Sequence, residues 1–527
     1  MGFFVLLFVI FVLLLGSFGG AVCFGLGGVY SLIEGLMFHC VDLYSSKLLM
    51  MLISCSILCF SYVFHYMGGG WSSKVWLVLM LVFFIGIMMG LMLSGNLITT
   101  LVFWEYLGLV SFVLILYYSV WESYRGGVVT LVSSRFGDVA LFIVVGCCIG
   151  MGSGISFVVF MLMVWLIVIT KSASFPFVSW LLEAMRAPTP VSSLVHSSTL
   201  VAAGVWFYLN YYQVVGLSVC NLGWGIDLLL VSSLISIIIS GVSALVCNDL
   251  KQIIALSTCS NISWVLFMMI MGEVDLALIQ LVVHGLSKCI IFFLVGDYIS
   301  SGSGGQMVNV LMVNIVGSLR DFVYVFLLVL GLSGFPFVGL YFSKHMFLGV
   351  FYSISFFNIG VMLVLYMCVV LSVVYCVRLI MLFDGFGVNS VSSIRLFYCI
   401  SPVIIFFSWV MSVYYCYNVP CWNYSLLDFS SVIVLLLLLA GLVLGVYLGM
   451  NLLVVSWFRW LMGLDIVVIV VEWLVVRLIS IYILFQFRWE VSLLWVLNNL
   501  MNLLICHYYV SIVLLSLCVV ILLVVNI

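Results

Sequence analysis

The 527-residue chain is 67% hydrophobic and 6% charged, with a formal net charge of −2 at pH 7. Soluble domains carry about 25% charged residues, so this composition excludes a water-soluble protein and indicates a polytopic helical membrane protein. The long continuous apolar runs exclude an outer-membrane barrel, and the sequence shows neither a basic patch for nucleic acid nor a nucleotide-binding fingerprint.

Apolar runs of membrane-spanning length follow one another along most of the chain. A spanning helix needs about 20 apolar residues, and runs of that length predict about fifteen spans. The predicted spans are residues 3–25, 46–66, 74–94, 97–118, 130–150, 155–175, 189–211, 226–246, 251–271, 276–299, 322–349, 355–381, 395–415, 430–449 and 505–526. The connections between them, such as 68–74, 122–127 and 300–305, leave no room for a soluble catalytic domain. We therefore expect an all-α protein with N-terminal helices (1–96), a core (97–349) and additional helices (350–450).

Two of these spans are interrupted. The run that carries Lys171 meets Pro176 five residues later, and the run that carries Lys344 contains Gly334 and Pro336. Proline removes a backbone donor and clashes with the preceding helical turn. Broken helices at matching positions in two halves are typical of inverted-repeat transporters with a site near the middle of the membrane. The predicted half-repeats are residues 97–211 and 226–349.

The tail differs from the rest of the chain. Its apolar sequence between residues 451 and 503 is interrupted by charges at Arg459, Asp465, Glu472, Arg477, Arg488 and Glu490. As one helix it would be on the order of 70 Å long at 1.5 Å per residue, too long for a single crossing. Two imperfect spans and one helix lying along the membrane are both compatible with this pattern, and the charges favour the lateral helix. Residues 504–527 predict a final anchoring helix.

Three lysines lie inside apolar runs: Lys171, Lys288 and Lys344. A lysine near the bilayer centre costs at least about 2.5–3.5 kcal/mol, so it usually has a partner or a function. Glu105 is likewise flanked by apolar residues. Burial disfavours the charged forms of lysine and carboxylate alike, which lets both exchange protons near neutral pH. We interpret these groups as a proton path, with a structural ion pair from Glu105 to Arg125 or Arg135 as the alternative for Glu105.

Two histidines lie within the same apolar region. His196 is flanked by serine and threonine residues, which suit close helix packing and can hold water beside an imidazole, so it is either a packing residue or a proton shuttle. His284 lies four residues before Lys288, which puts both on one helical face.

Several other charged residues support these groups. Arg135 and Asp138 are three residues apart and favour a local salt bridge, as do Glu183 and Arg186. Asp249 and Lys251 begin a predicted helix, where we expect them near a membrane interface.

The seventeen cysteines form no Cys-x-x-Cys pair, and the closest useful spacing is that of Cys55 and Cys59. Zinc and iron–sulfur sites need clustered ligands, so we predict neither a metal site nor a cofactor site in this chain. We interpret the cysteines as small apolar packing residues within helices.

These motifs together resemble the antiporter-like subunits of respiratory complex I. The longest matching run begins Lys171-Ser-Ala-Ser-Phe-Pro-Phe-Val-Ser-Trp-Leu-Leu-Glu-Ala-Met-Arg-Ala-Pro-Thr-Pro and continues through His196. The other matching segments are Phe103-Trp-Glu105-Tyr-Leu-Gly-Leu-Val-Ser, Arg135-Phe-Gly-Asp138, Asp249-Leu-Lys251-Gln-Ile-Ile-Ala-Leu-Ser-Thr, His284-Gly-Leu-Ser-Lys288 and Phe342-Ser-Lys344. The resemblance covers about residues 42–350, with the motifs in the expected order.

The resemblance implies a role for each matching residue. Glu105 and Lys171 would form the coupled pair of a first half-channel, and His196 would be the bridge that follows it. Lys288 with His284 would be the central relay, and Lys344 would lie near the exit path.

Departures from the family pattern accompany the match. His345 stands where an aspartate is common and Gln280 where a histidine is common, and residues 1–40 hold about one helix where two are usual. Lys344 and the charged tail favour the family member that carries a lateral helix over the relatives with a glutamate at the Lys344 position.

The resemblance also implies a function, a location and partners. The chain would be a proton-translocating subunit of NADH:ubiquinone oxidoreductase in the mitochondrial inner membrane, a location that the biased composition also favours. NADH, FMN, iron–sulfur clusters and ubiquinone would be handled by other subunits. Its partners would be other membrane-arm subunits, especially antiporter-like chains contacted by the lateral helix, together with phospholipids. The alternatives are a subunit of a multi-subunit sodium–proton antiporter, which the tail disfavours, and a structural clamp without pumping, which the retained lysines disfavour.

Overall fold

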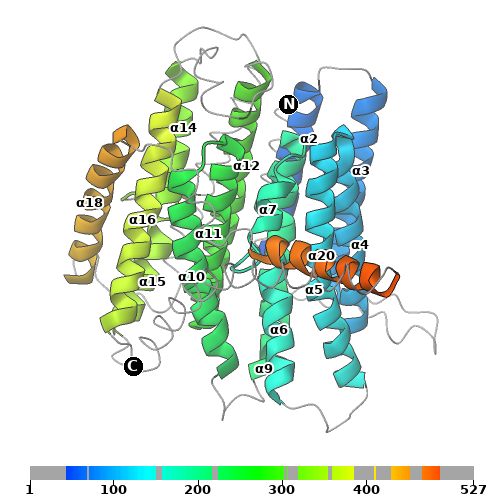
Figure 1. Ribbon diagram of the computed structural model, residues 1–527. Coiled ribbons are helices and arrows are strands. Elements are labelled where there is room, and N and C mark those ends of the chain that lie inside the picture. Colours follow the sequence, from blue (N-terminus) through cyan, green and yellow to red (C-terminus); the bar gives the residue numbers. More distant parts are fainter. Residues whose placement is uncertain are drawn as a thin grey trace.

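The computed structural model describes most of the chain as a bundle of helices (Figure 1). The described residues are 43–67, 71–149, 157–216, 224–301, 306, 319–336, 338–353, 359–384, 409–410, 429–451 and 466–486. Eight helices in these ranges are long and apolar enough to cross a membrane. The prediction of an all-α, multi-pass membrane protein is therefore confirmed. The predicted spans 3–25 and 505–526, most of 395–415, and the tail charges Arg459, Asp465, Arg488 and Glu490 lie outside the described residues.

The helices follow the apolar runs in chain order. Their bounds are α2 (Leu43–Tyr66), α3 (Trp71–Leu93), α4 (Leu97–Ile115), η1 (Leu116–Tyr118), α5 (Trp121–Ile149), α6 (Phe157–Lys171), α7 (Ser179–Ala184), α8 (Thr189–Val191), η2 (Ser192–Thr199), α9 (Leu200–Gly216), α10 (Trp224–Val246), α11 (Leu250–Ile270), α12 (Val274–Ser301), α14 (Leu319–Ser333), α15 (Tyr341–Ser353), α16 (Ile359–Asp384), α18 (Phe429–Asn451) and α20 (Ile466–Gln486). Both interruptions are present, since the chain leaves helical geometry after α6 and again between α14 and α15.

The predicted connection at residues 122–127 is wrong, because α5 is already helical from Trp121. Gly126 and Gly127, which indicated a loop, lie within the helix and allow close packing against neighbouring segments. A Cβ atom on Gly126 would lie 2.7 Å from the Glu183 carbonyl oxygen, so only glycine lets the start of α5 approach the end of α7 this closely. Close backbone approach at small residues is how helices associate in lipid, where the hydrophobic effect does not drive one helix against another.

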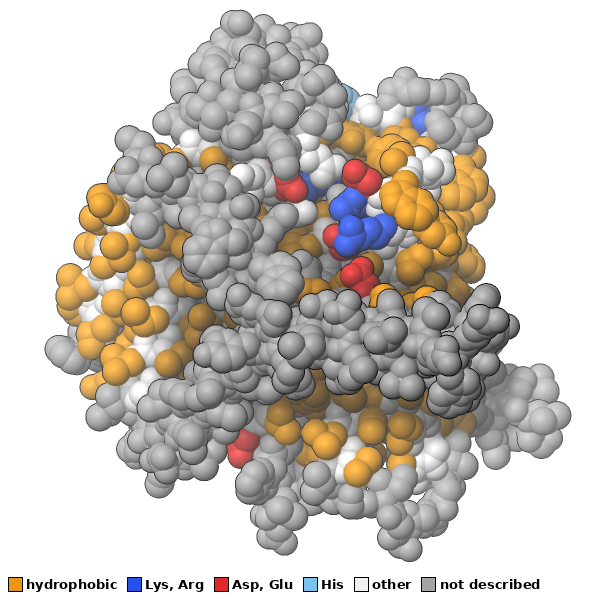
Figure 2. All heavy atoms as spheres, viewed as in Figure 1, with side chains coloured by type: hydrophobic (Ala, Val, Ile, Leu, Met, Phe, Trp, Pro, Cys, Tyr) orange, Lys and Arg blue, Asp and Glu red, His pale blue; other side chains and the backbone are white. Residues whose placement is uncertain are grey.

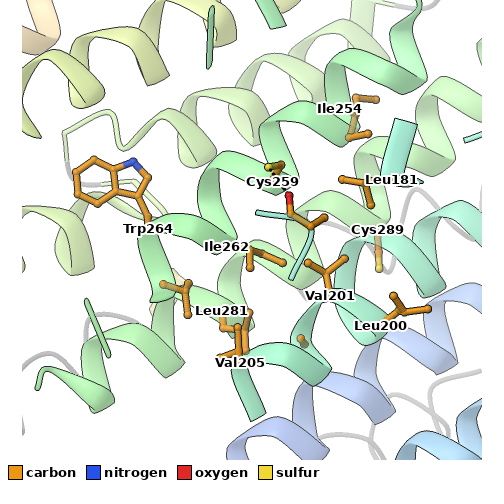
Figure 3. Close-up of a cluster of buried hydrophobic side chains, with 14 of the residues drawn as sticks. Leu181, Leu200, Val201, Val205, Ile254, Cys259, Ile262, Trp264, Leu281 and Cys289 are labelled. Carbon is orange, nitrogen blue, oxygen red and sulfur yellow. Dashed lines mark hydrogen bonds between the residues drawn. The ribbon is translucent and has the colours of Figure 1, made fainter. Parts of the chain in front are cut away.

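The core of the bundle is formed around α11 and α12. The apolar stretch of α11 is completely buried and that of α12 is almost so, whereas only 33% of the α5 stretch is buried. Figure 3 shows the packing at this centre, where Leu181 of α7 and Val201 of α9 meet Ile254 of α11 and Cys289 of α12. The polar groups on α11 and α12 are therefore held away from lipid by the surrounding helices.

The described part of the tail, α20, runs crosswise to the spanning helices and passes over α5, α6 and α7 (Figure 1). A cavity of about 290 Å³ lies where it crosses α5, lined by α5 residues from Trp121 to Ser133 and by Val468, Val471 and Glu472 of α20. The remainder of the predicted lateral helix, outside 466–486, is not among the described residues.

Candidate functional site

Lys171 is the last residue of α6, immediately before the first helix break. The break contains a cis bond between Phe175 and Pro176, and Ala173 has a left-handed backbone with φ 54°. The last turn of α6 has a hydrogen-bond donor from beyond the break, because the Trp180 indole Nε1 donates to the Thr170 carbonyl over 2.9 Å. The helix α6 thus ends at a lysine whose side chain is buried inside the protein.

Lys171 belongs to a network of four charged side chains on α4, α5 and α6. Its Nζ lies 3.8 Å from Asp138 Oδ1, and Arg135 Nη1 lies 3.4 Å from the other oxygen of the same carboxylate. Arg135 also forms the ion pair with Glu105, as in the alternative that the sequence left open for this glutamate. Asp138 is therefore the carboxylate that forms an ion pair with Lys171, and Glu105 is connected to it through Arg135. The Lys171 ammonium also lies 5.1 Å from the centre of the Trp104 ring, a cation–π distance.

His196 lies in η2, a π-helical segment that precedes α9. Its imidazole is fully buried, and neither ring nitrogen has a hydrogen-bond partner among the described residues. A cavity of about 20 Å³ is lined by both His196 and Lys171, together with Trp180. Its other polar lining residues are hydroxyls: Ser111, Thr130, Ser133, Ser134 and Thr170. This volume suffices for one water molecule, so a single water can connect the histidine to the lysine.

Glu183 and Arg186 form the salt bridge expected from their spacing, with Arg186 Nε 3.0 Å from Glu183 Oε2. Arg186 Nη1 also lies 2.8 Å from Glu122 Oε2, which connects the end of α7 to the start of α5. All three side chains are partly exposed. Figure 2 shows acidic and basic side chains gathered in a group, with hydrophobic side chains beside it.

Lys251 lies inside the protein, and its expected position near a membrane interface stays a prediction. It is 2% exposed, and its Nζ donates to the Ala187 carbonyl over 3.1 Å. Ala187 lies in the connection between α7 and α8. Its carbonyl therefore accepts the hydrogen bond that holds the Lys251 ammonium inside the protein. Asp249, the residue that precedes α11, is half-buried.

His284 and Lys288 lie one turn apart on α12, and both are buried. The Lys288 Nζ donates to the Ile254 carbonyl over 3.2 Å and to the Ser257 hydroxyl, both on α11. Neither ring nitrogen of His284 has a hydrogen-bond partner in the described part of the chain. A Cβ atom on Gly285 would lie 3.5 Å from Ser198, so this face of α12 meets the π-helical segment that carries His196.

Lys344 lies in the first turn of α15, directly after the second break. Gly334 has φ +83°, a left-handed geometry that favours glycine. The Lys344 Nζ donates to the Leu332 carbonyl over 3.5 Å, and the ammonium lies 5.9 Å from the Trp264 ring of α11. The second lysine at a break thus satisfies a carbonyl at the end of the preceding half-helix.

The neighbours of Lys344 connect α15 to its surroundings. The Ser343 hydroxyl donates to Gln280 Oε1 of α12 over 3.3 Å. His345 is 8% exposed, and its ring lies 5.0 Å from that of Tyr341.

The structure brings the predicted residues together in two groups. One contains Glu105, Arg135, Asp138, Lys171 and His196, and the other contains His284, Lys288 and Lys344 around α11. Pro176, Gly334 and Pro336 lie in the two breaks. Within the described residues, Lys171 is the buried lysine that has an ion pair, whereas Lys251, Lys288 and Lys344 donate to carbonyl or hydroxyl oxygens.

Sequence reasoning did not single out Trp104 or Ser257 as lysine neighbours. Both residues lie within the matched motifs, Trp104 directly before Glu105 and Ser257 directly before Thr258. Membership of these motifs is the signal by which the sequence could have identified them.

The comparisons with known proteins agree with this architecture. Residues 94–373 match the family model described as NADH:quinone oxidoreductase/Mrp antiporter, TM. The chain is 34% identical over 268 residues to NADH-ubiquinone oxidoreductase chain 5 of Apis mellifera ligustica, covering 50% of this chain and 47% of that protein. It is 36% identical over 297 residues to the chain 5 protein of Anopheles arabiensis, covering 54% and 76% respectively. For chain 5 of Caenorhabditis elegans the identity is 36% over 263 residues, covering 49% and 48%.

Two solved structures share the fold at low sequence identity. One comes from the Mrp complex of Dietzia sp. DQ12-45-1b, with a TM-score of 0.68, 18% identity, and coverage of 89% of this chain and 55% of that one. The other comes from the membrane-bound sulfane sulfur reductase, an archaeal respiratory membrane complex, with a TM-score of 0.65, 16% identity, and coverage of 84% and 90%. The chain spans about half the length of most of the chain 5 relatives named above. From the family match over more than half of its residues, the chain belongs to the NADH:quinone oxidoreductase/Mrp antiporter transmembrane family, and it is a homologue of NADH-ubiquinone oxidoreductase chain 5.

Proposed function

We propose that the chain is a proton-translocating membrane subunit of NADH:ubiquinone oxidoreductase in the mitochondrial inner membrane. The observation that carries this proposal is the buried Lys171, which has a carboxylate on one side and shares a water-sized cavity with His196 on the other. A lysine so placed can receive a proton, hold it as an ion pair and pass it on through water. The names of the relatives supply the complex and, with the composition of the chain, support the mitochondrial location.

Arg135 is the residue that connects Glu105 to this lysine. Its guanidinium reaches both Glu105 and Asp138, and Asp138 in turn pairs with Lys171. When Glu105 is protonated, Arg135 loses one partner and interacts more strongly with Asp138, which then holds the Lys171 ammonium less firmly. Protonation of Glu105 thereby favours proton release from Lys171 without direct contact between the two side chains.

The second group continues the path. An ammonium at Lys288 or Lys344 has carbonyl and hydroxyl acceptors but no carboxylate pair within the described residues, so the desolvation cost of its charge is only partly compensated. A proton that arrives there is readily passed on. His284 lies one turn from Lys288, and Lys344 would release the proton towards the exit.

In this proposal the chain performs no electron transfer. NADH, FMN, iron–sulfur clusters and ubiquinone are handled by other subunits, and the energy of quinone reduction reaches this chain through neighbouring membrane-arm subunits. The lateral helix, of which α20 is the described part, contacts other antiporter-like chains, and phospholipids fill the rest of the surroundings.

The first experiment separates a native gel of mildly solubilised source membranes and stains it for NADH dehydrogenase activity. Mass spectrometry then searches the active band for this chain. Its presence in a megadalton-scale active band supports the proposal. Its presence instead in a smaller band without NADH activity would indicate a multi-subunit sodium–proton antiporter.

The second experiment measures proton translocation driven by NADH oxidation in sealed membranes. Lys171→Ala should abolish translocation while the complex still assembles. Intact translocation in this variant would refute the assignment of Lys171 to the path.

A further inference from the structure

Three buried cysteine thiols donate hydrogen bonds to backbone carbonyls of the irregular segments around Lys171 and His196. The Cys259 Sγ of α11 donates to the Ala173 carbonyl over 3.1 Å. Those of Cys59 on α2 and Cys289 on α12 donate to the carbonyls of Pro190 and Ser193, over 3.2 Å in each case. The three thiols come from three different helices and are at most 1% exposed (Cys259 and Cys289 are labelled in Figure 3).

The accepting carbonyls lie where regular helical hydrogen bonding is interrupted. Ala173 is in the break two residues after Lys171, and its left-handed backbone turns its carbonyl out of any helical ladder. Pro190 and Ser193 lie at the entry to the π-helical segment, where the backbone changes from i→i−4 to i→i−5 pairing. Ala173 lies outside any helix, and a carbonyl of this kind inside a membrane protein needs a donor from a neighbouring helix or a nearby hydroxyl. The carbonyls of Pro190 and Ser193 accept further hydrogen bonds of the same kind.

Hydroxyl groups share this task in the π-helical segment. The Ser193 hydroxyl donates to the Pro190 carbonyl over 2.8 Å, and the Ser197 hydroxyl donates to the Ser193 carbonyl. The Ser197 Oγ also lies 3.6 Å from the Cys289 Sγ. The thiols are thus donors that reach the break and the π-helical entry from the surrounding helices, whereas the serines belong to the π-helical segment. They connect the backbone of the two proton-path residues to α2, α11 and α12.

We infer that Cys59, Cys259 and Cys289 are positioning residues, which hold the backbone that carries Lys171 and His196. This inference rests on the proposed function, because it gives those two side chains their task. It replaces the interpretation of these cysteines as apolar packing residues. A thiol is a weak donor. Each of these hydrogen bonds therefore allows a small backbone displacement when a proton moves, and it restores the original backbone position afterwards.

Cys368 provides the matched control. It lies on α16, is 2% exposed, and its thiol has no hydrogen bond among the described residues. Cys368→Ala removes the same atom from an equally buried site but leaves the path backbone untouched. If the cysteines only fill space, Cys289→Ala and Cys368→Ala will behave alike.

The first test measures the rate of NADH-driven proton translocation in membranes that contain the assembled complex, across a pH series. Cys289→Ala should lower this rate by about fivefold, the change expected from loss of one neutral hydrogen bond, and should shift the pH of half-maximal translocation. Cys289→Ser, which keeps a donor, should stay within about twofold of the wild type. The inference is overturned if Cys289→Ala matches Cys368→Ala, or if Cys289→Ser loses as much as Cys289→Ala. Cys59→Ala and Cys259→Ala provide the same comparison should Cys289→Ala fail to assemble.

The second test separates this inference from the proposed function. The infrared S–H stretching band moves to lower frequency when a thiol donates a hydrogen bond, and the difference spectrum of wild type minus Cys259→Ala reports the Cys259 thiol, which donates to the Ala173 carbonyl. That band should lie below the band obtained in the same way for Cys368, and equal frequencies would refute the hydrogen bond. Lys171→Ala is measured alongside: retained translocation in that variant counts against the proposed function, while the infrared result stands independently.

Discussion

The Lys171 ammonium and the Asp138 carboxylate lie 3.8 Å apart, with side chains only 2% and 4% exposed. Asp138 is shared, because Arg135 approaches its second oxygen to 3.4 Å. With Glu105 paired to Arg135, the four groups balance two positive charges against two negative ones. A change in protonation at Glu105, Asp138 or Lys171 leaves a net charge in a partly buried site, and the other groups of the network respond to it.

Asp138→Asn tests this relationship. The substitution leaves the Lys171 ammonium without its paired carboxylate, and breaking a buried pair costs about 3–5 kcal/mol. We expect proton translocation to fall at least about tenfold, with lower thermal stability of the complex. Asp138→Glu keeps the charge and should retain most of the activity. Translocation at the wild-type level in Asp138→Asn would show that the pairing has no role in the path.

Ser257→Ala tests the acceptor of Lys288. The Ser257 hydroxyl is one of two oxygens that accept from the Lys288 ammonium, and hydrogen bonds to charged groups contribute about 1.5–3 kcal/mol. We expect translocation to fall roughly tenfold or more, with NADH oxidation and assembly less affected. The control is Ser56→Ala, since the Ser56 hydroxyl bonds the Ile53 carbonyl in its own helix. Equal effects of the two substitutions would contradict the assignment.

Ala173→Gly tests the backbone beside Lys171. A left-handed conformation costs an L-residue roughly 1–2 kcal/mol, which glycine avoids, although glycine loses more entropy on folding. We expect a gain in thermal stability of up to about 1 kcal/mol together with lower translocation, because the break becomes less rigid. Ser119→Gly, at φ 49° on the exposed end of η1, should give the stability gain alone. A fall in translocation in both variants would argue against a local effect.

Gly204→Ala tests the approach of α9 to α6 behind Lys171. An added Cβ would lie 2.9 Å from the Val168 carbonyl oxygen and 3.0 Å from the Ser172 nitrogen, both of which are backbone atoms. Overpacking of this kind costs about 1–3 kcal/mol, so we expect a lower melting temperature and a smaller amount of assembled complex. Gly146→Ala is the control, because its Cβ would meet nothing within 4 Å. Unchanged assembly in Gly204→Ala would mean that the two helices are less closely packed.

Glu273, in the turn between α11 and α12, gives a pH prediction. Burial, with a further contribution from the nearby Asp275 carboxylate, raises the pKa of Glu273 above its ordinary value. The folded protein then binds this proton more tightly than the unfolded chain does, so the ionised carboxylate destabilises the fold above the raised pKa, and stability returns as the pH falls through it. Glu273→Gln should therefore be slightly more stable than wild type at neutral pH, within about 0.5 kcal/mol. Melting curves of the two proteins should converge on acidification, and a constant difference would contradict the pKa shift.

Much of this architecture follows from the sequence because lipid imposes simple rules. Length and hydropathy predicted the spanning helices, and Pro176 with Gly334 and Pro336 predicted both interruptions. The connection at residues 122–127 misled because glycine pairs indicate loops in isolation, whereas Gly126 permits close contact with a carbonyl on another helix. Which helices touch is a tertiary property, and local patterns do not contain it.

The site residues divide in the same way. Spacing within one helix predicted the pairs Arg135 with Asp138 and Glu183 with Arg186. Partners on other helices, such as Ser257 for Lys288, needed the fold. The contact of Lys251 also needed the fold, because its acceptor is the Ala187 carbonyl in the connection between α7 and α8. The roles of Glu105, Lys171, His196, His284, Lys288 and Lys344 remain predictions for the variants above.

The burial of α11 and α12 has a consequence for how the protein is made. Helices enter the bilayer from the ribosome in sequence, and each is first exposed to lipid. The hairpin of α11 and α12 carries Lys251, His284 and Lys288, which hydrocarbon tolerates poorly, yet in the finished bundle almost none of its apolar stretch touches lipid. Of the helices that precede this hairpin, α10 packs against α11 and α2 against α12. We therefore expect stable insertion of the hairpin to depend on these earlier helices being in place before it arrives.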